Sequence, residues 1–142
     1  MDKIRKFIKS WLPPIFYAIL IFYISSLERP FGIDFEVGNI DKLIHFFEYL
    51  FFGFLLIRAI RGSDAGITNN NAVLLAFIIG TFYGFTDELH QAVIPGRLAT
   101  ISDFISDSIG TFVGAVVFTW RGHPALKGHL RRLNNKTLNP KP

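Results

Sequence analysis

The chain has 142 residues, of which half are hydrophobic, 16 are Phe and only 18 % are charged. Soluble domains carry about 25 % charged residues, so this composition is typical of an integral membrane protein, and the net charge of +4 does not indicate a nucleic-acid partner. The absence of Cys excludes disulfides, thiol catalysis and thiolate metal sites.

Four segments are apolar enough to cross a bilayer, which requires about 20 mostly apolar residues. They cover residues 11–27, 43–60, 72–93 and 101–120. The first follows four basic residues, as the apolar part of a signal peptide does, but it lacks a convincing cleavage site. We therefore expect an uncleaved helix with Pro13 and Pro14 in its first turn, where a missing N–H costs nothing.

Lys and Arg are unevenly distributed around these segments. Four precede the first segment and six follow the last, whereas the third connection has only Arg97. The four segments predict a single domain, an all-α bundle of four transmembrane helices. Because cytoplasmic flanks carry the excess of Lys and Arg, both termini are predicted to lie in the cytosol. Residues 31–37 alternate like a strand and are expected on the outer membrane surface or over the bundle mouth. The basic tail, residues 121–142, is expected in the cytosol, either as an amphipathic helix on lipid headgroups or solvated.

Polar residues of the last three segments collect at the ends that this orientation places outside. They are Asp41, Lys42, His45, Tyr49, Asp87, Glu88, Gln91, Arg97, Asp103 and Asp107. An aspartate at the centre of a membrane helix costs about 2.5–3.5 kcal/mol, so acids there are expected to point into the bundle and to find partners. The sequence therefore predicts a polar pocket that opens to the outer leaflet.

Helical spacing places these residues on common faces. Lys42, His45 and Tyr49 share one stripe of the second segment. Asp103 and Asp107 share a stripe of the fourth that continues into a Gly-x-x-x-Gly pair, Gly110 and Gly114. A second such pair, Gly80 and Gly84, lies in the third segment. These pairs permit close approach of helices, within one chain or between the chains of a homo-oligomer.

Structural explanations compete with functional ones for several of these residues. Asp41 is explained equally well as a helix N-cap, and Lys42 and Arg97 as interfacial anchors. A lone His45 is more often a buried histidine with satisfied hydrogen bonds than a catalyst. The acids are harder to explain in this way, because ionisable residues inside a membrane are functional candidates by default.

The pattern resembles the VanZ-like family of small bacterial membrane proteins over residues 41–114. The residues that carry the resemblance are Asp41, Lys42, His45, Phe46, Tyr49, Asp87, Glu88, Gln91, Pro95, Gly96, Arg97, Asp103, Gly110 and Gly114. The family usually has Asn where this chain has Asp107, which puts carry-over of a hydrogen-bonding role at that position in doubt. The resemblance implies a bacterial plasma membrane protein near lipid-linked wall precursors, with a relation to teicoplanin resistance, and it implies no established reaction.

The leading hypothesis is a lipid-facing enzyme or binding site. His45, Glu88 and Asp103 are the candidate catalytic residues, with His45 as general acid or base oriented by Asp103 or Glu88. The candidate substrate-binding residues are Lys42, Tyr49, Asp87, Gln91, Arg97 and Asp107. The expected partners are membrane lipids, including a lipid-linked wall precursor. A ligand-binding or partner-binding bundle without chemistry is the alternative.

Two further hypotheses are weaker. A metal site could draw on His45, Glu88, His90, Asp103 and Asp107, but the spacings His45-x-x-Glu48 and Asp87-x-x-His90 are weak signals, so neither a metal nor a cofactor is expected. Proton or ion translocation is disfavoured because the inner halves of the segments lack relay residues.

Overall fold

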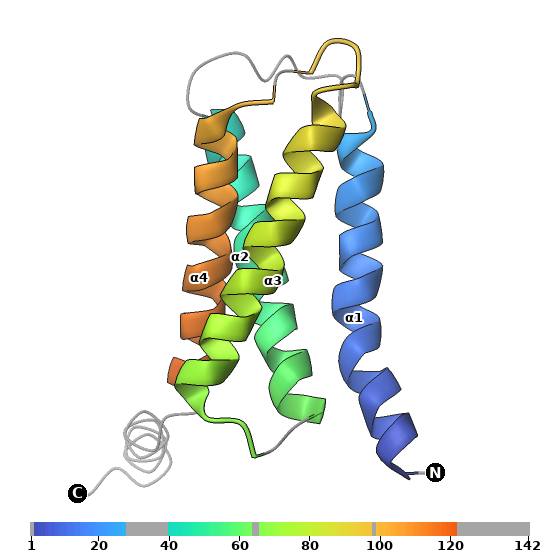
Figure 1. Ribbon diagram of the computed structural model, residues 1–142, viewed down its shortest axis with the longest axis vertical. Helices are drawn as coiled ribbons and strands as arrows, with labels where there is room; N and C mark the ends of the chain where they lie inside the picture. Colours follow the sequence, from blue (N-terminus) through green and yellow to red (C-terminus); the bar gives the residue numbers. More distant parts are fainter. Residues whose placement is uncertain (1, 28–39, 64–65, 98, 122–142) are drawn as a thin grey trace, which may run out of the picture.

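The chain forms a bundle of four helices in the computed structural model, which describes residues 2–27, 40–63, 66–97 and 99–121 (Figure 1). The helices are α1 (Asp2–Ser25), α2 (Ile40–Ser63), α3 (Asn69–Gln91) and α4 (Ile101–Arg121). Each is long and apolar enough to span a membrane, which confirms the predicted all-α, four-span architecture. The predicted surface segment at 31–37 and the tail after Arg121 lie outside the described residues.

Successive helices run in opposite directions (Figure 1). One end of the bundle, called here the polar end, holds the last turns of α1 and α3 and the first turns of α2 and α4. The opposite end holds Asp2, at the start of α1, and Arg121, at the end of α4. The assignment of this opposite end to the cytosol rests on the distribution of Lys and Arg and stays a prediction.

Helix α1 differs from the prediction at its start. It begins at Asp2, so Pro13 and Pro14 lie inside the helix, and their predicted place in the first turn is wrong. The residues before Pro13 include several Lys and Arg, which are good helix formers and extend the helix backward. Proline inside a helix removes a backbone hydrogen bond and favours a kink, and Figure 1 shows the dark-blue start of α1 leaning away from the rest of the helix.

Helices α2 and α4 approach each other through glycine. A Cβ atom on Gly110 would collide with the backbone carbonyl oxygen of Phe46, and one on Gly114 with that of Leu50. No flexible side chain could move aside at either contact, because the atoms met are backbone atoms. The predicted glycine stripe of α4 is therefore a packing face within one chain, and it fixes α4 tightly against α2.

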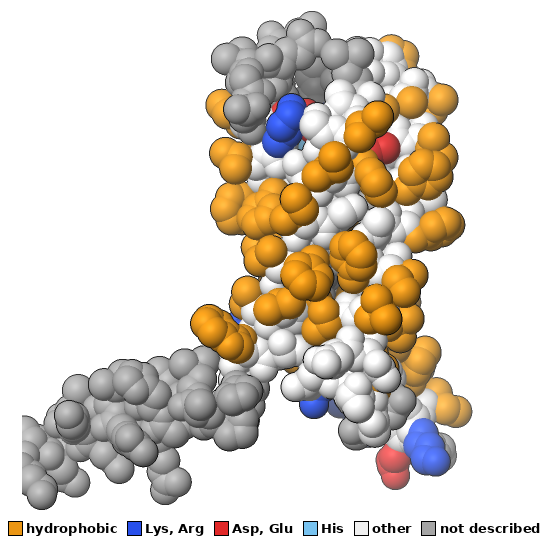
Figure 2. Space-filling model, turned by 60° about the vertical axis from the view of Figure 1, so that its left-hand side comes forward, with side chains coloured by type: hydrophobic (Ala, Val, Ile, Leu, Met, Phe, Trp, Pro, Cys, Tyr) orange, Lys and Arg blue, Asp and Glu red, His pale blue; other side chains and the backbone are white. Residues whose placement is uncertain are grey.

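The surface is apolar where the helices would meet lipid. Figure 2 shows hydrophobic side chains over the middle of the visible face, with Lys, Arg and acidic side chains gathered towards the two ends. Helix α1 contributes little to the interior, since its buried residues are Pro14, Ile21 and Ser25. Most of the core lies among α2, α3 and α4. Its polar part lies between the fully buried Tyr49 and the polar end of the bundle.

Candidate functional site

His45 lies at the centre of a buried polar cluster at the polar end. It comes from the second turn of α2, and its side chain is only 5 % exposed. Its Nδ1 lies 3.0 Å from Oδ1 of Asp107, a fully buried carboxylate on α4. Asp107 is one turn from Gly110, so the close approach of the two helices at that glycine brings the carboxylate within reach of the imidazole.

Glu88 connects the end of α3 to the start of α4. Its Oε2 accepts a hydrogen bond of 2.9 Å from the backbone N–H of Thr100, and its Oε1 lies 3.9 Å from His45 Nδ1. Thr100 in turn caps α4, because its Oγ1 accepts from the backbone N–H of Asp103 at 3.1 Å. The same hydroxyl donates to Asp103 Oδ2 at 2.6 Å, which orients that carboxylate. The capping residues thus also position two acids of the cluster.

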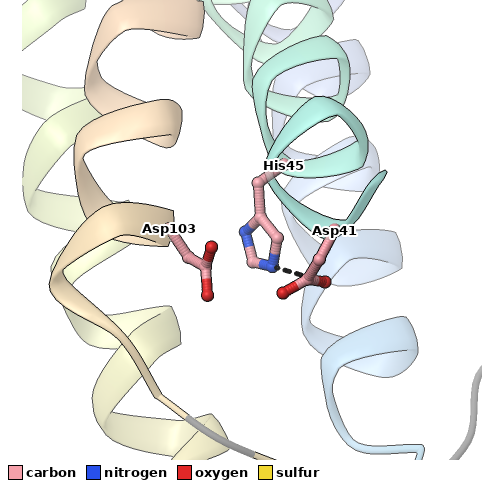
Figure 3. Close-up of side chains that lie close together, drawn as sticks. All are labelled: Asp41, His45 and Asp103. Atoms are coloured by element: carbon pink, nitrogen blue, oxygen red, sulfur yellow. Dashed lines mark ion pairs between the residues drawn. The ribbon is translucent and has the colours of Figure 1, made fainter. Parts of the chain in front are cut away.

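Asp41 and Lys42 form the accessible rim of the cluster. Their side chains are 30 % and 39 % exposed, against 2 % for Asp103. Lys42 Nζ lies 3.9 Å from Asp103 Oδ1, and His45 Nε2 lies 3.9 Å from Asp41 Oδ1. Figure 3 shows the imidazole of His45 between the carboxylates of Asp41 and Asp103. Access to the cluster therefore leads past Asp41 and Lys42 to the Nε2 side of the imidazole.

A second chain of hydrogen bonds adjoins the cluster. Arg97 donates to Oε1 of Gln91 at 2.8 Å, and Gln91 Nε2 donates to Asp87 Oδ2 at 2.9 Å. Gln91 Nε2 also lies 3.4 Å from the hydroxyl oxygen of Ser25 at the end of α1. Arg97 is thereby held against α3, and its guanidinium is fixed beside the polar end.

Several buried oxygens of the site lack a hydrogen-bond partner among the described residues. These atoms are Tyr49 Oη, Asp87 Oδ1, Glu88 Oε1, Asp103 Oδ1 and Asp107 Oδ2. Buried polar atoms are nearly always hydrogen-bonded in native proteins, and leaving one unpaired costs about 1–3 kcal/mol. Such a concentration of unpaired oxygens within one cluster is a feature of sites that hold water, an ion or a ligand.

The structure brings together most of the residues predicted for the site, but the pairing differs from the prediction. The imidazole of His45 is held by Asp107, and not by Asp103 or Glu88 as expected. Asp107, which stands where the family usually has Asn, thus makes a hydrogen bond to His45. Tyr49 lies against Gly84 on α3, below the cluster and away from its rim.

Two residues of the cluster are absent from the predicted catalytic and substrate-binding sets. Asp41 is predicted at this end of the bundle without such a role, although its position four residues before His45 places both side chains on one helix face. Thr100 was not considered, although Thr100-x-x-Asp103 before an apolar segment is a capping signature. His90, named from the sequence as a possible metal donor, lies apart from the acids: its Nε2 is 2.9 Å from Ser26 Oγ, and its ring stacks on Phe22.

The pairing of His45 with Asp107 determines which ring nitrogen is available for chemistry. An ionised carboxylate only accepts hydrogen bonds, so Nδ1 is the nitrogen that donates to Asp107, and in the neutral imidazole Nε2 then carries the lone pair. Nε2 is the nitrogen on the side of Asp41, towards the rim. A histidine held in this way is suited to take a proton from a bound molecule or to coordinate a metal.

Comparison with known protein families gives a match that covers most of the chain. The family model described as VanZ/LLP1 matches residues 3–122, which include every residue of the polar cluster and all of the four helices except Asp2 at the start of α1. Neither the comparison with curated proteins nor the comparison with solved structures gives a match.

Proposed function

This chain belongs to the VanZ/LLP1 family, and on that premise we propose that its polar cluster binds the headgroup of a lipid or lipid-linked cell-envelope precursor. The protein would act at the outer leaflet of the bacterial plasma membrane. The observation that carries the proposal is the position of the cluster, which is buried inside an apolar bundle with the partly exposed Lys42 and Asp41 at its edge. A site of this kind is reached by a molecule whose polar part lies at the membrane interface.

Two cations are placed to hold an anionic headgroup. Lys42 is a point charge at the rim, and Arg97 is fixed by its bond to Gln91. Charge-assisted hydrogen bonds from Lys and Arg are the usual means of holding a phosphate. The role proposed for both residues is therefore to clamp a phosphate or pyrophosphate beside the Nε2 of His45.

The hydrophobic chain of such a ligand has a place on the same bundle. A groove of about 1020 Å³ runs along α3 and α4, and it is almost entirely apolar. It extends from Asn69 and Thr119 near the opposite end to Phe104 and Ile105 near the polar end. Phe104 directly follows Asp103, so a chain lying in this groove would end close to the cluster.

Chemistry at the site would use His45 as its acid or base. With Nδ1 held by Asp107, Nε2 could take the proton of a water or hydroxyl whose oxygen attacks the phosphorus. The bond from phosphorus to the leaving oxygen would break, and the imidazolium would give the proton to that oxygen. A change made to a lipid-linked wall precursor, or its sequestration, would account for a relation to teicoplanin resistance. Among the described hydroxyls of the cluster, Thr100 is engaged by Asp103 and Tyr49 is buried, so a water is the better nucleophile.

Binding without chemistry is the alternative function. It is favoured by the same engagement of Thr100 and Tyr49, which leaves neither of these hydroxyls free to act as a nucleophile. The site would then hold an amphiphilic ligand or a partner protein. Turnover of the bound lipid in a purified sample separates the two functions.

The proposal is tested by native mass spectrometry of the protein extracted gently from membranes. Lys42→Ala removes a rim cation, and Arg58→Ala removes an exposed cation from the opposite end of the same helix as a matched control. A charge-assisted hydrogen bond contributes about 1.5–3 kcal/mol, so Lys42→Ala should reduce retention of a phosphate-bearing lipid about tenfold or more. Equal retention in the wild type and both variants, or retention of no lipid by any of them, would contradict the proposal.

A further inference from the structure

The rim of the cluster has the donor set of a metal site. One ligand atom from each of Asp41, His45 and Asp103 lies within 4.8 Å of the other two. Figure 3 shows the two carboxylates on either side of the imidazole, with Nε2 directed to Asp41. Two of these side chains come from α2 and one from α4, and the glycine contact fixes these helices against each other. The donors are therefore held by packed helices and not by a loop.

Two observations beyond the clustering of acids point to a bound cation. Asp103 is 2 % exposed, and its Oδ1 accepts no hydrogen bond from the described chain. The nearest cation, Lys42 Nζ, is 3.9 Å away, which is too far for a hydrogen bond. An ionised carboxylate buried in this way is costly unless it is paired or coordinates a metal.

The orientation of His45 is the second observation. Metal-bound histidines commonly donate their other ring N–H to a carboxylate, which fixes the tautomer and raises the basicity of the ligating nitrogen. Asp107 is that carboxylate, at 3.0 Å from Nδ1. Nε2 makes no hydrogen bond within the described residues, and it lies on the side of the rim. Asp107 thus prepares Nε2 to coordinate an ion.

We propose that Asp41, His45 Nε2 and Asp103 bind one divalent metal ion, with Mn²⁺ or Zn²⁺ as the chemical class. Carboxylate oxygens suit Mn²⁺ and imidazole suits Zn²⁺, so a set of two oxygens and one nitrogen fits either. Three protein ligands leave a coordination position open, as in catalytic metal sites. That position faces the rim, where Asp41 is 30 % exposed.

The ion resolves a conflict of charge in the site. The cluster and its adjoining chain contain five acids and only two Lys or Arg residues, yet Lys42 and Arg97 point to an anionic ligand. The acids are Asp41, Asp87, Glu88, Asp103 and Asp107. A divalent ion at the rim adds two positive charges where the headgroup would enter and gives its phosphate oxygens a direct ligand. This role of the ion rests on the proposed function, whereas binding of the ion is measured without any lipid.

A second group of donors makes the assignment testable. His45, Glu88 and Asp107 also offer ligand atoms within 4.8 Å of one another, on the Nδ1 side of the ring. That group is fully buried, and Nδ1 cannot both donate to Asp107 and coordinate an ion. The rim group leaves the bond to Asp107 intact and has access, so it is the group assigned here.

The test is Mn²⁺ and Zn²⁺ binding to the full chain in detergent, after removal of metals with a chelator. The wild type is expected to bind one equivalent, and the Mn²⁺ electron paramagnetic resonance signal should show coupling to an imidazole nitrogen. Asp41→Asn, at a partly exposed side chain, is expected to weaken binding about tenfold or more. Glu48→Gln is the matched control, since it changes a half-buried acid of the same helix outside both donor groups and should leave binding unchanged.

Three results would overturn the proposal. One is that the folded wild type binds neither ion. Another is that Asp41→Asn binds as tightly as the wild type. The last is that Glu88→Gln abolishes binding while Asp41→Asn does not, which would place the ion in the buried group. A wild type that binds the metal ion but retains no lipid would count against the proposed function alone, and a wild type that retains lipid but binds no metal ion would count against the metal site alone.

Discussion

The two halves of one helix face of α4 differ in the way that they meet α2. Gly110 and Gly114 bring the helix backbones into contact, whereas Asp103 and Asp107, earlier on the same face, meet polar side chains of α2. The glycine half has no side chain with which to adjust, and the acidic half has carboxylates with unpaired oxygens. The glycine half thus fixes the distance between α2 and α4, and this distance brings the carboxylates of the acidic half within reach of Lys42 and His45 on α2.

The largest expected effect comes from breaking the glycine half. Gly114→Leu would force a side chain into the backbone of Leu50, and overpacking of this kind costs about 3 kcal/mol or more when no side chain can move. We expect a strong decrease in the thermal unfolding midpoint in detergent, or failure of the protein to accumulate as a monodisperse species.

Val117→Leu is the control for this change. It adds bulk on the same helix, but at a side chain that is 40 % exposed. Substitutions at such positions usually change the free energy of unfolding by less than about 0.5 kcal/mol. If Gly114→Leu were as stable as Val117→Leu, the close contact between α2 and α4 would be wrong.

An intermediate effect is expected in the acidic half, where two changes at one position separate charge from hydrogen bonding. Asp107→Ala removes the acceptor for His45 Nδ1 and should destabilise the protein by about 1–3 kcal/mol. Asp107→Asn keeps an acceptor oxygen and should cost clearly less. Thermal unfolding of both variants beside the wild type measures the difference. An Asn variant as unstable as the Ala variant would show that the charge of Asp107, and not its hydrogen bond, holds His45.

The smallest effect is expected at Thr111, which directly follows Gly110. This residue is fully buried on α4, and its hydroxyl has no hydrogen-bond partner among the described residues. Thr111→Val has nearly the same shape and removes an unpaired polar atom, so stability should be unchanged or higher by up to about 1 kcal/mol. A clear loss of stability would mean that the hydroxyl is paired and that the polar region extends deeper along α4.

The fold was largely predictable because its signals are strong in the sequence. Long apolar segments give the four helices, and the spacing of Asp103, Asp107, Gly110 and Gly114 gives the face of α4 that meets α2. The start of α1 was not predictable from hydropathy, since a helix continues through charged residues that hydropathy places outside the membrane. The two prolines favoured a helix that begins just before them, whereas in the structure they lie inside a helix that begins at Asp2.

The members of the site were predictable, but their pairing was not. Periodicity shows which residues share a helix face, yet it gives neither the relative shift nor the rotation of two helices in contact. Those depend on where the backbones meet, here at Gly110 and Gly114, and they decide that His45 reaches Asp107 before Asp103 or Glu88. Asp41 became part of the site for the same reason, because its role depends on the position of Asp103 on another helix.

The attachment of α1 has a consequence for how its sequence can evolve. Tyr83 on α3 donates to the backbone carbonyl oxygen of Ala18 at 2.6 Å, and Tyr17 on α1 reaches the backbone carbonyl of Glu48. A bond to a backbone acceptor places no chemical demand on the side chain at that position. In the apolar part of α1, apart from Tyr17 and the residues that make side-chain hydrogen bonds, apolar substitutions should therefore be tolerated. Sequence differences between related chains should concentrate there, while Tyr17 and Tyr83 are retained.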